Sequence, residues 1–291
     1  MSRHESVMAS RRGHGLLRGW FVLFLLFLYL PTVLLILFSF NDADSPQFPF
    51  EGFTLSWYEA AWDTPAIRDA VLNSVLVGLG TSILATSLGV LSSYALARRR
   101  FRGRNAVFAV MVLPLVVPYV VLGIALLTLF LRGPLEISLS LWAVLAGHIV
   151  VSLPYTILLL VPRIAAVDRR LEEAAEDLGA SALYTFRRVM LPLIFPAILS
   201  SFLIAFVVSI DEVVIASFLV GDQVTYPIYL YSGLRFSDRV MRLIAVGSVM
   251  IVVSFALVLL AEIIRRRGDR LAKATFPLVD APVAAAEKEA P

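Results

Sequence analysis

The sequence predicts an all-α integral membrane protein with six transmembrane helices, and three observations support this fold class. Hydrophobic residues make up 59% of the 291 residues and charged residues only 16%, and the mean hydropathy is +0.85. A soluble domain of this length has no core large enough for so much apolar surface. Apolar runs long enough to cross a hydrocarbon core of ~30 Å recur along the chain. Arginines gather in alternate connections between these runs.

The apolar runs divide the chain into a polar N-terminal tail (1–19), a transmembrane domain (20–264) and a C-terminal tail (265–291). We expect the six spans at about 20–40, 71–97, 106–130, 141–161, 195–220 and 241–264. The first run is too long for a typical signal peptide and lacks a small-x-small cleavage site before Asn41, so we interpret it as an uncleaved span. The Ala- and Pro-rich composition of the C-terminal tail predicts disorder.

Prolines interrupt the third and fourth predicted spans. Pro114 and Pro118 should kink the third span, and Pro154 lies in the fourth span, near His148. A kink of this kind either lines a pathway or only serves packing, and the sequence leaves both readings open. A lone histidine in a helix bundle is more often a hydrogen-bonded core residue than a ligand, and we interpret His148 in that way.

The basic residues predict the orientation of the chain. Most arginines lie in the N-terminal tail, in the connection 98–104, around the loop 168–192 and in the C-terminal tail. The opposite connections hold only Arg68, Arg132, Arg235 and Arg239. The positive-inside rule therefore places both termini and the loop 168–192 in the cytoplasm.

On the opposite side, the connection 41–70 carries six carboxylates against a single arginine, Arg68. Trp57, Tyr58 and Trp62 suit a short helix at the membrane interface. The acidic connection is either a solvated loop or a docking surface for an external partner.

The fifth predicted span contains two adjacent acids, Asp211 and Glu212. An acid near the centre of a transmembrane helix costs roughly 2.5–3.5 kcal/mol on insertion scales, so such residues face the protein interior or an aqueous path. The pair therefore either lines a pathway or forms an interhelical hydrogen bond that holds the helices.

The loop 168–192 reads as a helix, a glycine turn and a second helix at the membrane surface. Asp168 can cap the first helix, Gly179 can end it, and Ser181 can cap the second. An apolar stripe at helical spacing follows the first helix: Leu171, Ala174, Ala175 and Leu178. An amphipathic interfacial helix without a partner is the alternative reading.

The same loop resembles the EAA loop of ATP-binding-cassette importer permeases. The resemblance rests on Glu173-Ala174-Ala175, Gly179 and Val189-x-Leu191-Pro192, where Val189 replaces the frequent isoleucine of the family. It implies that the loop couples the membrane helices to an ATPase. It further implies that Glu173 bonds within the coupling site, Gly179 makes the turn and Pro192 sets the angle into the fifth span. The coupling residues so implied are Glu173, Ala174, Ala175, Gly179, Leu191 and Pro192.

Three further stretches make the chain, from about Phe38 to Arg265, similar to the second permease subunit of spermidine/putrescine importers. They are Ser39-Phe40-Asn41 with Gly52-Phe53-Thr54 and Trp57-Tyr58; His148, Leu153-Pro154 and Arg163; and Ser209 to Ile215. The resemblance implies a type I importer permease (MetI-like) fold and a substrate pathway in which Asp211 and Glu212 help to pass a polyamine cation. The chain departs from the family at Tyr119, where an acid is common, so a different organic solute remains an alternative.

The resemblance also implies partners in a bacterial inner (plasma) membrane. They are cytoplasmic ABC ATPase subunits, a second permease subunit, an external (periplasmic) substrate-binding protein and membrane lipid. Nucleic acid is not expected as a partner, because each arginine cluster adjoins an apolar span.

The sequence contains no motif for ATP hydrolysis. Its two lysines, Lys273 and Lys288, follow the last span, and no glycine-rich turn precedes a Lys-Ser/Thr pair. There is no cysteine, and the histidines and carboxylates lack metal-ligand spacing. We therefore expect no catalytic residues, metal or cofactor, and no enzymatic activity in this subunit.

Two rival functions come from other classes. A self-sufficient secondary transporter would use Asp211, Glu212 and His148 as a proton relay, but no paired inverted halves are visible in the sequence. A membrane scaffold that transports nothing would leave the two intramembrane acids unexplained.

Overall fold

The computed structural model describes residues 3–134 and 136–275, and the side chains of residues 17–134 and 136–267. Within these ranges the secondary structure is helical, and the only β-type pairing is an isolated bridge between Asn41 and Phe53. This confirms the predicted all-α class. The chain divides into two compact units, Met1–Pro65 with Ser232–Ile251 and Ala66–Tyr231 with Val252–Pro291.

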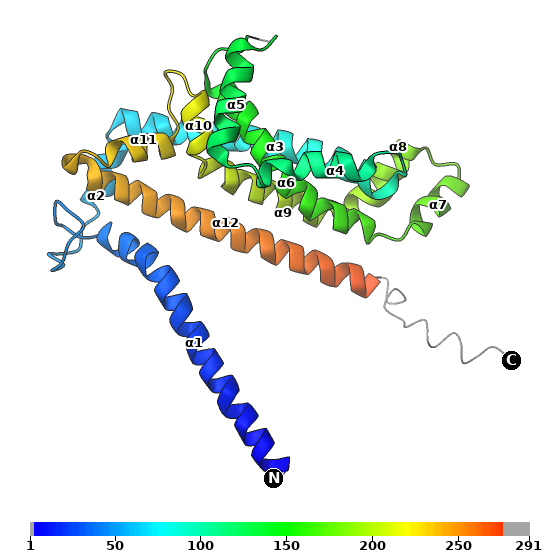
Figure 1. Cartoon of the computed structure of the whole chain (residues 1–291), viewed down its shortest axis with the longest axis horizontal. Helices are drawn as coiled ribbons and strands as arrows, with labels where there is room; N and C mark the ends of the chain where they lie inside the picture. Colours follow the sequence, from blue (N-terminus) through cyan, green and yellow to red (C-terminus); the bar gives the residue numbers. More distant parts are fainter. Residues whose placement is uncertain (1–2, 135, 276–291) are drawn as a thin grey trace. The chain divides into compact units, whose positions relative to one another are not determined.

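The elements follow the chain in the order coloured in Figure 1. They are α1 (Arg3–Phe38), α2 (Ser56–Trp62), α3 (Pro65–Arg98), α4 (Arg104–Val112), η1 (Leu113–Leu115), α5 (Tyr119–Arg132), α6 (Leu141–Ala165), α7 (Arg170–Asp177), α8 (Ala182–Thr185), the π-helical turn η2 (Phe186–Met190), α9 (Leu191–Ile210), α10 (Val214–Leu219), α11 (Tyr226–Gly233), η3 (Ser237–Arg239) and α12 (Val240–Thr275).

Five helical segments of the described residues are long and apolar enough to cross a membrane. They are Leu17–Phe38, Pro65–Arg98, Leu141–Ala165, Ala182–Ile210 and Ser237–Arg267. A bent pair, Arg104–Leu115 with Tyr119–Arg132, raises the number to six when it is counted as one span. The six predicted spans therefore correspond to five single candidate spans and one bent pair.

In the first unit, a polar network ties the end of α1 to α2 and to the start of α12. The hydroxyl of Tyr58 lies 2.6 Å from the Ser39 hydroxyl and 3.0 Å from that of Ser248. The indole N–H of Trp57 donates to the carbonyl of Asn41 at 2.9 Å. The apolar part of α1 is unburied within the described chain, as expected for a helix that faces lipid or a partner.

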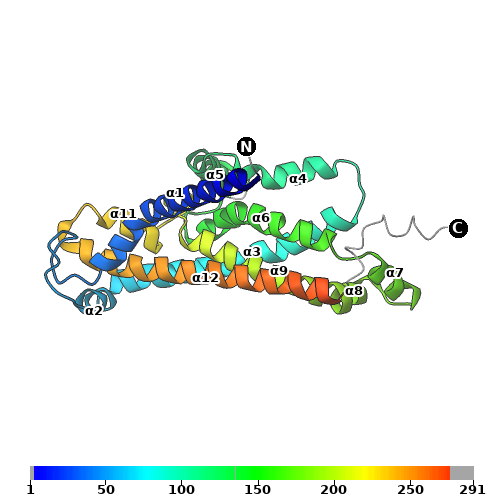
Figure 2. The same cartoon turned by 90° about the horizontal axis from the view of Figure 1, so that it is seen from below.

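In the second unit, α3, α6 and α9 lie side by side (Figures 1 and 2). Small residues on α3 allow the close approach, because the side chain of Thr156 on α6 occupies the position that a Cβ at Gly89 would take. The Thr156 hydroxyl also donates to the carbonyl of Ala85 at 3.3 Å. A buried core forms where α5, α6 and α10 meet, around Leu126, Val144 and Ile215.

The third predicted span is bent as the prolines predicted. Pro114 lies in η1 and Pro118 precedes α5. The helix direction bends by 106° between the two halves. Neither proline offers a backbone N–H, so each removes one helical hydrogen bond at the break. The kink is therefore confirmed, and it is a break rather than a gentle bend.

The fifth predicted span is not continuous, which corrects the range 195–220. The helix α9 ends at Ile210, and residues 211–213 separate it from the short helix α10. The break falls on the acid pair, where no proline or glycine predicts one.

Both terminal helices extend beyond the predicted spans. The helix α1 begins at Arg3, within the expected N-terminal tail, and α12 continues to Thr275. The prediction of a disordered tail from residue 265 is therefore wrong for residues 265–275. The remainder of that tail, residues 276–291, lies outside the described residues.

We predict that Gly89→Val will separate α3 from α6, because the added side chain collides with Thr156. Overpacking of this kind costs about 1–3 kcal/mol. The thermal unfolding midpoint of the detergent-purified protein should fall. Gly19→Val is the matched control, because no atom lies within 4 Å of the position that its Cβ would take. An unchanged midpoint for Gly89→Val would contradict this packing.

Candidate functional site

The loop 168–192 folds as the sequence predicted. The Asp168 carboxylate accepts a hydrogen bond from the backbone N–H of Arg170 at 2.9 Å, at the start of α7. Gly179 has φ +81°, which a residue with a side chain adopts only with strain. The Ser181 hydroxyl then accepts from the N–H of Tyr184 at 3.4 Å and caps α8.

Most of the predicted coupling residues lie on the surface of the chain. Glu173, Ala174, Gly179 and Pro192 are exposed, whereas Ala175 and Leu191 are half-buried. The apolar stripe ends in a solvent-exposed residue, since Leu178 is 89% exposed in the described chain. The loop thus presents an apolar, helical tip that is available to a partner.

The glutamate that bonds inside the chain is Glu172 rather than Glu173. Its carboxylate lies 2.7 Å from the Nε of Arg98, at the end of α3, and accepts from the Tyr94 hydroxyl at 2.9 Å. The side chains of Arg98 and Glu172 are 6% and 14% exposed. Removing one partner from a pair this well buried typically costs about 3–5 kcal/mol. We call Tyr94, Arg98 and Glu172 the Arg98 cluster.

Sequence reasoning missed the Arg98 cluster. Arg98 is the first of three consecutive arginines, and in the sequence this run indicates only the orientation of the chain. Its neighbours Arg99 and Arg100 are exposed, whereas Arg98 turns inward. The available signal was a charge at the end of a helix whose small residues already predicted close packing.

The acid pair is divided between two environments. Glu212 is buried, and its carboxylate accepts from the backbone N–H groups of Val214 at 3.0 Å and Ala216 at 3.1 Å. Asp211 is exposed on the described chain. Glu212 therefore caps the start of α10, whereas the Asp211 carboxylate has a side-chain hydrogen bond with Ser254 on α12 and stays exposed to a ligand.

A histidine completes the buried side of this break. The Nε2 of His148 lies 3.5 Å from the Glu212 carboxylate, and its Nδ1 lies 2.8 Å from the Ser209 hydroxyl. His148 is 1% exposed. The interpretation of His148 as a hydrogen-bonded core residue is confirmed, and it joins α6 to the end of α9.

Tyr119 begins α5, directly after the break at Pro118. Its hydroxyl lies 3.4 Å from that of Tyr155 on α6. In the described chain no hydrogen bond joins Tyr119 to Asp211 or Glu212. Two helix breaks therefore carry exposed or half-buried polar groups, one at Tyr119 and one at Asp211. Irregular backbone at membrane depth is tolerated where protein or an aqueous path surrounds it.

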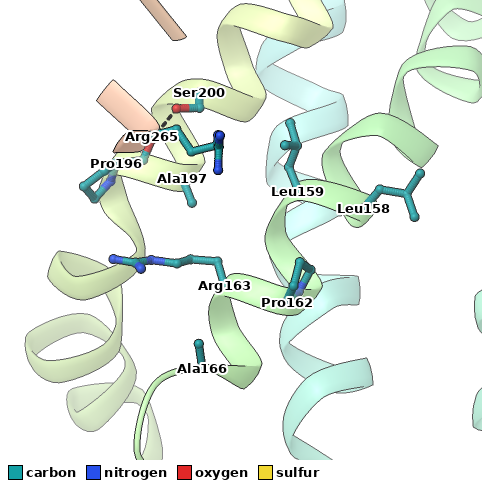
Figure 3. Close-up of a pocket in the computed structure, with 9 residues that line it drawn as sticks. All are labelled: Leu158, Leu159, Pro162, Arg163, Ala166, Pro196, Ala197, Ser200 and Arg265. Atoms are coloured by element: carbon teal, nitrogen blue, oxygen red, sulfur yellow. Dashed lines mark hydrogen bonds between the residues drawn. The ribbon is translucent and has the colours of Figure 1, made fainter. Parts of the chain in front are cut away.

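A cavity of about 290 Å³ lies between α6, α9 and α12 (Figure 3). Arg163 and Arg265 contribute guanidinium groups to its wall. Ser200, also in the wall, donates to the carbonyl of Ala261 at 2.9 Å and so ties α9 to α12. From Ser200 to Asp211 the chain advances about 16 Å at the helical rise of 1.5 Å per residue. The cavity is thus separate from the acids, and its arginines disfavour a cationic solute.

Sequence comparison shows that the chain is similar to membrane subunits of transport systems. A family model described as "Binding-protein-dependent transport system inner membrane component" matches residues 85–270. The spermidine/putrescine transport system permease protein PotC of Haemophilus influenzae is 35% identical over 246 residues, which are 84% of this chain and 93% of that protein. The putrescine transport system permease protein PotI of Escherichia coli is 34% identical over 72% of this chain and 76% of its own length. The resemblance predicted from the motifs is confirmed.

Solved structures with the same fold agree. A chain of a bacterial ABC transporter involved in the import of the acidic polysaccharide alginate has a TM-score of 0.69 at 19% identity, covering 90% of this chain and 98% of that one. A chain of the methionine ABC transporter MetNI, in an inward-facing conformation, has a TM-score of 0.54 at 14% identity, covering 73% of this chain and 95% of that one. At these identities the likeness shows the importer permease (MetI-like) fold alone.

We predict that Glu212→Ala destabilises the chain, whereas Asp211→Asn does not. The first change removes the acceptor for two backbone N–H groups and leaves His148 without its carboxylate. Loss of one such capping acceptor costs about 0.5–2 kcal/mol. Thermal unfolding of the two purified variants should show a lower midpoint for Glu212→Ala only. Equal midpoints would mean that Glu212 does not hold the break.

Proposed function

Because the chain belongs to the family of binding-protein-dependent transport system inner membrane components, we propose that it forms half of the translocation pathway of an ATP-binding-cassette importer for a polyamine. The chain is a multi-pass inner-membrane subunit, and its relatives are permease subunits rather than enzymes.

One observation carries the choice of substrate. Asp211 is an exposed carboxylate at a helix break, directly after the candidate membrane span Ala182–Ile210. A carboxylate there attracts a cation, and polyamines carry several ammonium groups. The half-buried rings of Tyr119 and Tyr155 add aromatic faces, which also attract cations. Relatives at 34–35% identity are named as spermidine/putrescine and putrescine permease proteins.

The proposed partners follow from the surfaces that the chain leaves open. The exposed tip around Leu178 inserts into a cytoplasmic ABC ATPase subunit. A second permease subunit covers the exposed face at Asp211 and closes the pathway. An external binding protein docks on the acidic connection 41–70. This arrangement requires both termini and the loop 168–192 to be cytoplasmic, as the arginines predict.

The helix α9 connects the loop to the acid. It begins at Leu191, where the loop ends, and stops at Ile210, beside Asp211. Its 20 residues span about 30 Å at the helical rise of 1.5 Å per residue. Movement of the loop by the ATPase would therefore displace the break that carries Asp211. In this proposal Glu173 faces the ATPase, Gly179 forms the turn and Pro192 fixes the start of α9.

A different organic solute is the second candidate. Tyr119 stands where the resembling family commonly has an acid, and its hydroxyl lies near that of Tyr155. Two hydroxyls suit a neutral or less charged solute better than a second carboxylate would. Direct measurement of uptake separates the two candidates.

We predict that Asp211→Asn abolishes most polyamine uptake while Asp211→Glu retains part of it. The carboxylate is exposed and has a side-chain hydrogen bond with Ser254. An asparagine keeps an oxygen that can accept this bond, so the change chiefly removes the charge that attracts a cation. Uptake of labelled putrescine and spermidine should be measured in cells that lack the gene and carry each variant, at matched membrane levels. Normal uptake by Asp211→Asn would exclude this role for Asp211. No polyamine uptake by the wild type would favour another solute.

We also predict that Gly179→Val uncouples ATP hydrolysis from uptake without removing the protein from the membrane. A β-branched residue at φ +81° strains the turn by roughly 1–3 kcal/mol, although no atom lies within 4 Å of the position of the added Cβ. Ala180→Val is the control, because the left-handed conformation is confined to Gly179 in this turn. Solute taken up per ATP hydrolysed should fall for Gly179→Val alone. A normal ratio would argue against a fixed turn as the coupling element.

A further inference from the structure

The Arg98 cluster joins the coupling loop to a helix far away in sequence. Arg98 and Glu172 are separated by 74 positions, yet their charged groups meet at 2.7 Å. A second guanidinium nitrogen of Arg98 donates to the carbonyl of Val167 at 2.7 Å, and Arg169 donates in return to the carbonyl of Arg98 at 2.9 Å. The end of α3 thus donates one hydrogen bond to the start of the loop and accepts another from it.

Apolar packing reinforces the same junction. The ring of Tyr94 meets that of Phe186 edge-on, with centroids 5.2 Å apart. Phe186 belongs to η2, the turn between α8 and α9. Tyr94 and Phe186 both pack on the buried cluster that contains Ile164, Met190 and Ile194. The end of α3 therefore contacts the loop both before α7 and after α8.

The opposite end of α3 is also tied to a distant segment. The side-chain amide of Asn73 donates to the carbonyl of Val224 at 3.0 Å, and the Ser74 hydroxyl accepts from the N–H of Tyr226 at 2.8 Å. Between Ser74 and Arg98 the helix is continuous and about 36 Å long at a rise of 1.5 Å per residue. Close packing of Gly89 against Thr156 stiffens its middle.

We propose that Tyr94 and Arg98 are positioning residues that transmit movement of the coupling loop along α3 to the segment that precedes α11. This inference rests on the proposed function and deepens it. The loop is covalently continuous with α6 and α9, and the Arg98 cluster adds α3 as a third helix that follows it. The segment before α11 lies on the side proposed for the binding protein, so α3 would carry information in both directions across the membrane.

The test uses the complete complex of both permease subunits, ATPase subunits and binding protein, reconstituted in proteoliposomes. Two quantities are measured with putrescine and spermidine: solute taken up per ATP hydrolysed, and the stimulation of ATP hydrolysis by solute-loaded binding protein. The variants are Arg98→Gln, Arg98→Lys and Tyr94→Phe. Arg100→Gln is the matched control, since Arg100 is exposed two positions further along the same basic run.

The expected result is a loss of coupling in an assembled complex. Uptake per ATP should fall at least five-fold in Arg98→Gln and at least two-fold in Tyr94→Phe, and stimulation by the binding protein should fall with it. Arg98→Lys keeps the charge and should lie between Arg98→Gln and the wild type. Arg100→Gln should match the wild type. A role limited to folding would instead lower the amount of assembled complex and leave the ratio unchanged.

Ratios within two-fold of the wild type in both Arg98→Gln and Tyr94→Phe would overturn the inference. If Arg98→Gln fails to assemble, Tyr94→Phe and Arg98→Lys are judged by the same limit. Tyr94→Phe removes a single hydroxyl and keeps the ring on Phe186, so its assembly is expected. Failure of the proposed function is distinguishable, because the wild-type complex itself would then show no ATP-driven uptake.

Discussion

Backbone groups inside a bilayer must be satisfied by the protein, and this constraint governs the rest of the structure. An unbroken transmembrane helix satisfies it automatically, so a break needs a replacement for each lost hydrogen bond. At the second break the replacement is a side chain, since the Glu212 carboxylate accepts from two N–H groups of α10. A charge that would be costly in lipid thus becomes the structural element that makes the break possible.

Because Glu212 satisfies the backbone groups at the break, its neighbour Asp211 can serve another role. Adjacent residues at a helix end point in different directions, so one acid turns into the core and the other faces outward. His148 and Ser209 hold the inward acid in place. Asp211 is therefore positioned both by its own hydrogen bonds to Val207 and Ser254 and by the contacts of its neighbour, as is usual for preorganised binding groups.

Much of the fold could be predicted from the sequence, because its strongest signals are local. Apolar runs, the two prolines of the third span, and the caps around α7 and α8 all act within a few residues. The second break could not be predicted, since no proline or glycine lies there and the contact between Glu212 and His148 joins residues 64 positions apart. For a similar reason, the sequence could not predict that Glu172 rather than Glu173 bonds to Arg98. On a short helix consecutive residues differ by about 100° in direction, and only the position of α3 decides which one it meets.

Leu178 has a consequence for how the subunit is handled in the cell. Leu178 is 89% exposed, and Leu183 and Tyr184 beyond the turn are 58% and 57% exposed, so the loop presents several apolar side chains to water. On the proposed assembly an ATPase subunit covers them, and a copy made in excess of its partner keeps them exposed. A balanced supply of the two subunits would keep this surface covered.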